Sequence, residues 1–257
     1  MHGVEEKMEF EAYRALHERI FKENDLQKYI DLVSRETLKS ATDQFYQLTE
    51  HMLMINQHMN LTAVRDPEAV IYLHYADSLK IADAIPFGAT LCDVGCGAGF
   101  PSLPLAIVRE DLSFFAIDST EKKTRYVAET AALLGVSKRL EVRAARAEEL
   151  GGGEKREAFE CVTARAVSNL QMLAELCLPL VSVGGVFLSM KGANWALEYK
   201  DAENAIEQLG GTLENMEEFD LRNGSAVEKR CLLTIRKVKR TPACYPRAWG
   251  KIKSKPL

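Results

Sequence analysis

The chain has 257 residues, of which 47% are hydrophobic and 27% charged, a composition typical of an ordinary globular protein with a buried core. It contains no run of eighteen apolar residues and no basic-then-apolar leader, so we expect neither a membrane span nor export, and a cytoplasmic location. The net charge of -4 is unevenly distributed: residues 229–257 carry ten Lys or Arg and no Asp or Glu, which favours a polyanionic partner over a merely solvated tail.

The first sixty residues have the pattern of amphipathic helices. After Gly3 they contain neither glycine nor proline, and apolar residues recur three and four positions apart, as at Phe45, Leu48 and Met52. We therefore predict an N-terminal helical segment over residues 1–65. A main domain over 66–240 and a basic C-terminal tail over 241–257 complete the predicted organisation.

A further helix is predicted to begin after Asp66, which can cap its N-terminus while Pro67 occupies the first turn. On this helix His74 and Ser78 lie one turn apart on one face. A histidine in such a place is more often a structural hydrogen-bonding group, and the alternative is a contact to the substrate.

From residue 90 onward, short apolar runs alternate with helical segments. The strand candidates are 91–94, 114–117, 140–143, 159–163, 186–190, 213–219 and 231–236, and helices fit near 102–109, 121–134, 169–181 and 195–209. Such alternation predicts an α/β fold whose mostly parallel seven-stranded sheet is covered on both faces. The last two strands, joined through Asn223-Gly224, predict an antiparallel hairpin at the edge.

A glycine-rich turn joins the first strand to the following helix in LCDVGCGAGFPSLP, residues 91–104. Glycine at positions 95, 97 and 99 lets a ligand lie against bare backbone, and Pro101 fits the first helical position. A dinucleotide-binding loop reads G-x-G-x-x-G, but position 100 is Phe. The sequence D-x-G-x-G-x-G instead resembles the first motif of S-adenosylmethionine (SAM) dependent methyltransferases, with a nucleotide loop or a structural turn as the alternatives.

Polar residues close the next strands, and in an open parallel sheet ligands bind beyond the strands' carboxyl ends. The Asp118 carboxylate can accept hydrogen bonds from both ribose hydroxyls of SAM, or cap the next helix. After the third strand, the main chain at Ala147 and the side chain of Glu148 can meet the adenine edge. Arg165 and Lys191 close the fourth and fifth strands, where a charged side chain points toward the site rather than the core.

The fourth strand's end argues against base-dependent methylation. It reads TARA, not the D/N-P-P-Y/F turn of an adenine amino methyltransferase. Cys161 lies inside a strand and Cys177 inside a helix, unlike the nucleophile of a cytosine-C5 enzyme, and Lys191 lacks the Asp partner of a ribose 2′-O enzyme. Guanine N7 is already nucleophilic, so alignment and exclusion of water can supply up to roughly 7–11 kcal/mol. We expect no general base.

The six cysteines are scattered, with no C-x-x-C pair and no histidine at ligand spacing. We expect neither disulfides nor a zinc or other metal site, and most of these thiols should act as small hydrophobic groups.

Several motifs together resemble the RsmG (GidB) family. They are NLTAVRDP at 60–67, HYADSL at 74–79, DVGCGAGFPSLPLAI at 93–107, Arg165-Ala166, Lys191-Gly192, YPR at 245–247 and KPL at 255–257. The resemblance covers about residues 45–257 and leaves the first forty outside the family's usual range. It implies a Rossmann-like class I SAM-dependent methyltransferase that methylates N7 of a guanine in the decoding-site loop of bacterial 16S rRNA. The partner would be 16S rRNA or the small ribosomal subunit, with no membrane or metal, and we expect a monomer.

The site residues follow from the strand ends together with this resemblance, and Phe100 rests on the resemblance alone. The expected cofactor-binding residues are Gly95, Gly97, Phe100, Asp118, Ser119, Thr120, Ala147, Glu148 and Arg165. The RNA-binding candidates are His74, Lys191, Arg247, Lys251, Lys253 and Lys255; the last four would contact phosphates. Tyr245 or Trp249 could stack on a base drawn out of the RNA loop, or simply pack.

Two other functions fit the same sheet. One is a SAM-dependent methyltransferase of another RNA, a protein or a small molecule, which the basic C-terminus disfavours. The other is a SAM- or RNA-binding module without turnover, which would bind SAM and methylate no RNA.

Overall fold

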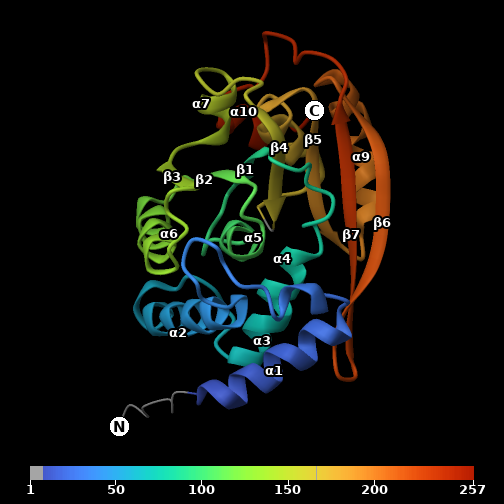
Figure 1. Ribbon diagram of the computed structural model, residues 1–257. Coiled ribbons are helices and arrows are strands. Elements are labelled where there is room, and N and C mark those ends of the chain that lie inside the picture. The colour runs from blue at the N-terminus through green and yellow to red at the C-terminus, as the bar shows by residue number, and fades with distance from the viewer. Residues whose placement is uncertain (1–7, 166) are drawn as a thin grey trace.

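The computed structural model describes residues 8–165 and 167–257. A seven-stranded sheet in the order β3-β2-β1-β4-β5-β7-β6 forms its centre (Figure 1). The strands are β1 (Thr90–Val94), β2 (Ser113–Asp118), β3 (Leu140–Ala144), β4 (Phe159–Arg165), β5 (Val181–Gly192), β6 (Gly211–Asn223) and β7 (Ala226–Lys237). The first five pair in parallel, and β7 is antiparallel to both β5 and β6. The predicted parallel sheet with an antiparallel hairpin is confirmed.

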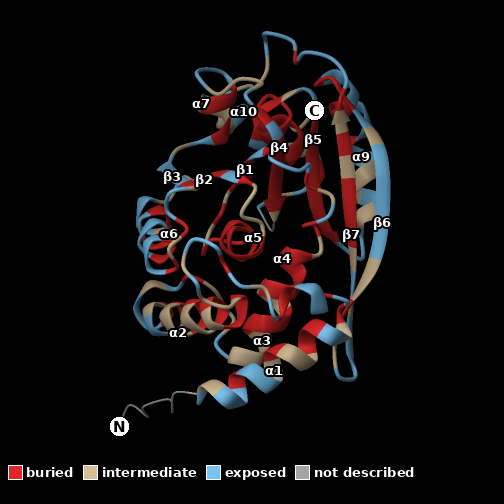
Figure 2. Ribbon diagram, viewed as in Figure 1, coloured by how far each residue is buried: buried red, intermediate tan, exposed pale blue. Residues whose placement is uncertain are grey.

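Helices cover both faces of the sheet. Leu91 and Phe114 join one buried cluster, and the next residues of the same strands, Cys92 and Phe115, join the other. The first face carries α5 (Ser102–Val108) and α6 (Glu121–Leu133), and the second carries α8 (Leu170–Cys177) and α9 (Trp195–Gln208). Burial on both faces explains why the central strands read as nearly continuous apolar runs (Figure 2).

The helix predictions fail at two prolines. The helix predicted over 169–181 ends at Cys177, because Pro179 has no N–H to continue the helical hydrogen bonds. Pro101, predicted at the first helical position, lies one residue earlier as the N-cap of α5, with φ -91° and ψ 0° after a cis peptide bond. A short helix, α7 (Ala147–Gly151), was not predicted.

The N-terminal segment shares a core with the sheet. It comprises α1 (Phe10–Glu23), the 3-10 turn η1 (Gln27–Tyr29) and α2 (Ala41–Met59), whose buried residues join the same cluster as Leu91 and Phe114. Ser40 and Asp43 form a capping box at the start of α2. Asn24, after α1, bonds the backbone of Arg222 in both directions, with N···O distances of 2.8 and 2.9 Å. The first helix is thereby fixed to the β6–β7 hairpin.

One continuous helical stretch leads from the N-terminal segment to the sheet. It runs through α3 (Pro67–Val70), the π-helical stretch η2 (Ile71–Ala76) and α4 (Asp77–Leu79). Asp66 accepts a hydrogen bond from Ala69 N at 2.8 Å, which confirms the predicted cap. Tyr72 donates to the carbonyl of Leu221 at 3.1 Å, so this stretch also holds β6.

The basic C-terminal residues contain a helix, α10 (Trp249–Ser254), that packs on α8. Its Ile252 is fully buried. Arg247, just before it, donates from Nε and Nη2 to the carboxylate of buried Glu175, at 2.8 and 2.5 Å. Residues expected to form a basic tail are therefore fixed to the sheet's helical layer.

All six cysteines lie in the described part of the chain. Five are buried and Cys244 is exposed, and each is a free thiol. Among residues 8–165 and 167–257, no helix has the length and apolar character needed to cross a membrane.

Candidate cofactor and substrate site

The glycine-rich turn is tied to the end of the neighbouring strand β2. The N–H groups of Gly95 and Cys96 donate to the carbonyl of Ile117 at 2.8 and 2.9 Å. Gly95 has a φ of +75°, and a Cβ there would lie 2.5 Å from Cγ2 of Val167. Gly97 has a φ of +56°, and the nearest atom to a Cβ there would be Gly95 O at 3.9 Å. The backbone at Gly97 therefore faces space that a ligand can fill.

Asp118 holds the turn from the end of β2. Its Oδ2 accepts from Gly97 N at 3.1 Å and its Oδ1 from Thr120 N at 2.8 Å. Thr120 is the N-cap residue of α6 and makes no cap bond with its own side chain. Asp118 accepts from the N–H of Thr120 itself and not from a first-turn N–H, so it orders the approach to the helix without capping it. Each carboxylate oxygen has a further lone pair. Asp118 can therefore hold the turn and still accept from a ribose.

Asp93, the acidic residue that opens the motif, fixes the start of α5. Its Oδ2 accepts from Ser102 Oγ at 2.7 Å and from Ser102 N at 3.3 Å. The side chain is fully buried, and burial raises the pKa of Asp93 to about 7 because it disfavours the charged form.

Two adjoining cavities lie beyond the carboxyl ends of β1 to β4. The first, of about 450 Å³, runs from the glycine-rich turn to η2. The second, of about 220 Å³, shares four lining residues with the first and extends to α7. Larger hollows of about 840 and 870 Å³ lie beside Arg156 and beside α2, away from these strand ends. Every predicted cofactor-binding residue lines one of the two adjoining cavities: Gly95, Gly97, Phe100, Asp118, Ser119, Thr120 and Arg165 the first, and Ala147 and Glu148 the second.

The shape and polarity of these cavities fit SAM. The open backbone at Gly97 can accommodate the methionine portion, the free lone pairs of Asp118 can accept from the ribose, and the smaller cavity can take adenine. Among the described residues, no group of three or more His, Cys, Asp or Glu side chains is placed to hold a metal ion.

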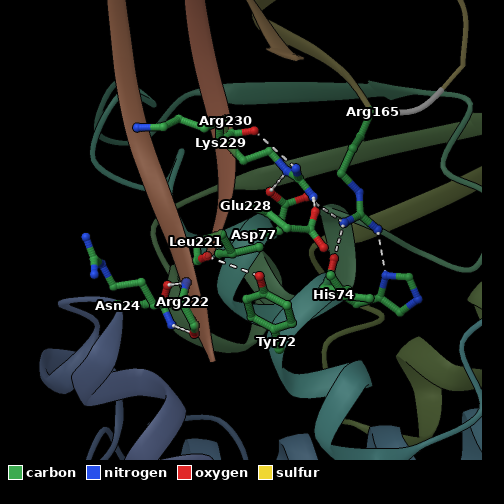
Figure 3. Close-up of polar contacts among 11 residues, drawn as sticks. Asn24, Tyr72, His74, Asp77, Arg165, Leu221, Arg222, Glu228, Lys229 and Arg230 are labelled. Carbon is green, nitrogen blue, oxygen red and sulfur yellow. Dashed lines mark hydrogen bonds and ion pairs between the residues drawn. The ribbon is translucent and has the colours of Figure 1, made fainter. Parts of the chain in front are cut away.

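An aromatic and cationic cluster closes the first cavity at the η2 side. His74 stacks on Phe100 with ring centroids 4.5 Å apart and 19° between the planes. The guanidinium of Arg165 lies 5.3 Å from the centroid of the same Phe100 ring. Arg165 Nη1 donates to Leu73 O and to Asp77 Oδ2, both at 3.0 Å, and Arg230 Nε donates to Asp77 Oδ1 at 3.3 Å (Figure 3). One carboxylate thus holds two arginines.

His74 is neutral and has a defined tautomer. Arg165 Nη2 lies 3.2 Å from Nδ1 of His74, and because a guanidinium only donates, Nδ1 must accept (Figure 3). The ring proton therefore lies on Nε2, 3.0 Å from Thr62 Oγ1. Burial, and then the charge of Arg165, lower the pKa of His74 to about 3. At neutral pH the ring is an uncharged wall of the cavity.

A further cavity of about 520 Å³ lies against the same cluster, and His74 and Arg165 line both it and the first cavity. Lys191 reaches its wall, but its Nζ donates to Ser168 O at 3.0 Å and to Glu198 Oε2 at 2.8 Å, and only 6% of its side chain is exposed. Glu228 and Arg230, both on β7, line this cavity and form an ion pair at 2.6 Å. We call this space the acceptor cavity.

The structure separates the C-terminal RNA-binding candidates. Lys251, Lys253 and Lys255 are exposed on and just after α10. Arg247 differs, because its guanidinium is paired with buried Glu175, which gives it a structural role in place of the predicted phosphate contact.

Sequence reasoning missed two residues of the site and gave a third another place. Asp77 and Arg230 complete the cluster around Arg165, and Trp249, named as a residue that could stack on an RNA base or simply pack, lines the smaller cavity. Asp77 carried a signal, since it lies in the HYADSL motif, three positions after His74. Arg230 and Trp249 come from segments distant in sequence, and no local pattern places them at this edge of the sheet.

Solved structures share this architecture. The O-methyltransferase from Bacillus cereus in complex with SAH aligns with a TM-score of 0.53 at 14% identity, covering 89% of this chain and 100% of that one. A SAM-dependent methyltransferase from Aquifex aeolicus aligns with a TM-score of 0.50 at 19% identity, covering 68% and 96%. The protein therefore has the class I SAM-dependent methyltransferase fold.

Sequence comparison gives the family. The GidB family model, described as rRNA small subunit methyltransferase G, matches residues 41–226. The Ribosomal RNA small subunit methyltransferase G of Lactobacillus delbrueckii subsp. bulgaricus is 41% identical over 219 residues, 83% of this chain and 90% of that protein. Its counterpart in Clostridium beijerinckii is 35% identical over 240 residues, 90% of this chain and 99% of that protein. The chain belongs to the GidB family. Because the second match covers 90% of the chain, the similarity reaches into the first forty residues, which had been placed outside it.

Proposed function

We propose that the protein transfers the methyl group of SAM to N7 of a guanine in the decoding-site loop of 16S rRNA. Membership of the GidB family supports the ribosomal substrate. The observation that carries the proposal is the wall formed by His74 and Arg165, which the first cavity, here called the cofactor cavity, shares with the acceptor cavity. A base in the acceptor cavity would meet the methyl group at that wall.

The polar groups around the wall suit an acceptor that needs no deprotonation. SAM supplies an electrophilic methyl group on a sulfonium centre. His74 is neutral, its Nδ1 is engaged by Arg165, and its pKa of about 3 is too low for a base at neutral pH. Asp77 is paired with Arg165 and Arg230, and Glu198 with Lys191. These residues can orient a guanine and exclude water while its N7 lone pair attacks.

The remaining assignments concern the RNA and the assembly. We propose that Lys251, Lys253 and Lys255 contact phosphates, since all three are exposed on or beside one short helix. We propose a monomer as the active form. A ribosomal substrate supports a cytoplasmic site of action.

A labelling experiment tests this function. Small ribosomal subunits from cells lacking the protein are incubated with the protein and tritiated SAM, and the labelled nucleotide is mapped by reduction and aniline cleavage, which is selective for N7-methylguanine. The proposal predicts one labelled guanine in the decoding-site loop. Label in another RNA, in protein or in a small molecule would favour a different methyltransferase, and SAM binding without any label would favour a binding module.

A further inference from the structure

The C-terminal helix α10 forms part of the cofactor site. Trp249, its first residue, lines the smaller cavity together with Ala147 and Glu148. The indole is partly buried against the cluster that includes Ile117 and Leu176, which line the same cavity. An aromatic residue from the end of the chain therefore faces the space left for adenine.

Three contacts hold Trp249 in this place. Arg247, two residues earlier, is paired with Glu175 on α8, and Ile252, three residues later, is fully buried. Gln171, at the start of α8, donates to the carbonyl of Leu257. Because α8 also supplies Leu176 to the cavity, the indole and the cavity floor are anchored on the same element.

The same short helix also carries exposed lysines. Lys251 and Lys253 are exposed and flank buried Ile252, and Lys255 follows directly. A single six-residue helix thus presents an aromatic ring to the smaller cavity and ammonium groups to solvent. Few residues separate these two surfaces, so a shift of α10 on RNA binding must also move Trp249.

We propose that Trp249 forms the outer wall of the adenine subsite and that α10 thereby couples SAM binding to RNA binding. Adenine and indole are flat π-systems, and stacking of a base on an aromatic side chain contributes about 1–3 kcal/mol. Coupling between two ligands is reciprocal. RNA held by the lysines should therefore strengthen SAM binding, and SAM should strengthen RNA binding. The inference rests on the proposed function for the identity of both ligands.

A single-tryptophan protein tests the adenine contact. The chain has two tryptophans, and Trp195, hydrogen-bonded to Glu218, lines none of these cavities. In Trp195→Phe, titration with S-adenosylhomocysteine should change the emission of Trp249 in step with binding measured by calorimetry. Trp249→Ala should raise the Kd roughly tenfold, the equivalent of about 1.4 kcal/mol. Trp249→Phe should restore most of the affinity, and Trp195→Phe should leave it unchanged.

Two readouts separate this contact from a structural role. Adenosine, as a competing ligand, should lose affinity in Trp249→Ala by the same factor as S-adenosylhomocysteine, because only the adenine end is affected. The thermal unfolding midpoint of the unliganded variant should stay close to that of the wild type. Equal Kd values for the wild type and a folded Trp249→Ala, or an unchanged emission at saturation, would overturn the inference.

The coupling is measured with and without small ribosomal subunits. In the wild type, subunits should lower the Kd for S-adenosylhomocysteine at least fivefold, the lower end of typical coupling. Trp249→Ala should abolish this effect, whereas Lys253→Ala should keep the RNA-free affinity and weaken only the coupling. An equal effect of subunits on wild type and Trp249→Ala would refute coupling through α10. If the wild type bound no S-adenosylhomocysteine, the proposed function itself would fail, which calorimetry alone reveals.

Discussion

The Asp77 carboxylate holds two arginines of the site in place. Its side chain is 7% exposed and pairs with Arg165 through one oxygen and Arg230 through the other. Arg165 in turn fixes the tautomer of His74. The shape of the wall between the cofactor and acceptor cavities therefore depends on one negative charge.

We expect Asp77→Asn to lower the free energy of unfolding by roughly 1–3 kcal/mol, because two charged hydrogen bonds lose their ionic acceptor. It should also reduce kcat for methyl transfer, since Arg165 is no longer held. Asp220→Asn is the matched control: Asp220 bridges Arg222 and Lys229, but at the surface, where solvent screens both pairs, so a clearly smaller cost than that of Asp77→Asn is expected. Urea unfolding of both variants checks the prediction, which equal costs would contradict.

Three buried residues should make stability depend on pH. Burial lowers the pKa of His17 to about 3 and, with Arg165, that of His74 to about 3, while it raises that of Asp93 to about 7. Between pH 6.5 and about 3.8, the unfolded chain protonates both histidines and the native protein does not, whereas only the native protein protonates Asp93. The unfolded state thus binds one net proton more, and stability falls as the pH falls.

These three groups should cost about 1.4 kcal/mol per pH unit between about pH 5.5 and 4.5. Urea unfolding at several pH values measures this slope. His17 packs between Phe21 and Phe45, so His17→Leu keeps an apolar filling and removes one titrating group. Its slope should be lower than that of the wild type by about 1.4 kcal/mol per pH unit over this range, and a slope as steep as that of the wild type would show that His17 does not contribute.

At the scale of elements, the long apolar strands and the regular helices were predictable, because a parallel sheet covered on both faces imposes them. The hairpin was predictable from Asn223-Gly224, but the insertion of β7 between β5 and β6 was not, since no local pattern encodes strand order. Helix α10 was missed because Ile252 is its one buried residue and has a lysine on either side, so the segment lacks an apolar helical pattern. Its anchor joins Arg247 to Glu175 across 72 residues, a pairing that the sequence does not reveal.

The same reasoning explains which parts of the site were predictable. Asp118 and Arg165 close strands of a parallel sheet, so topology alone brings them to one edge. Asp77 and Arg230 reach that edge from the first residue of α4 and from an antiparallel strand. Their positions depend on how the N-terminal helices and the hairpin pack, and packing of distant segments has no local signature.

The attachment of α1 to the hairpin is testable at Asn24. Its side chain is buried and bonds the carbonyl and the N–H of Arg222. Asn24→Ala should lower the free energy of unfolding by roughly 1–3 kcal/mol, since it leaves these backbone groups unpaired, and should speed hydrogen exchange of the Arg222 amide. Asn223→Ala is the control, because it removes only a contact to Arg19. If Asn223→Ala lowered the free energy of unfolding and Asn24→Ala did not, the assigned role of Asn24 would be wrong.

For the whole molecule, the distribution of charge matters more than its sum. The net charge is -4, yet the exposed lysines of α10 lie beside the cofactor site. Lys253→Ala should weaken RNA binding and reduce the slope of log K against log salt by about one, since one phosphate contact is lost. Lys138→Ala, exposed between α6 and β3, should leave that slope unchanged. Filter binding at several salt concentrations measures both, and identical slopes for the two variants would count against α10 as the RNA-binding surface.

Because five thiols are buried, unfolding can be followed by counting the cysteines that react with an alkylating reagent. Burial raises the pKa of Cys92, Cys96, Cys161, Cys177 and Cys231 and shields them from reagent, whereas Cys244 is exposed. Alkylation of the native protein should add one adduct by mass spectrometry, and alkylation in denaturant should add six, the number of free cysteines. Any compound that stabilises the fold should therefore delay the last five adducts and leave the first at its usual rate.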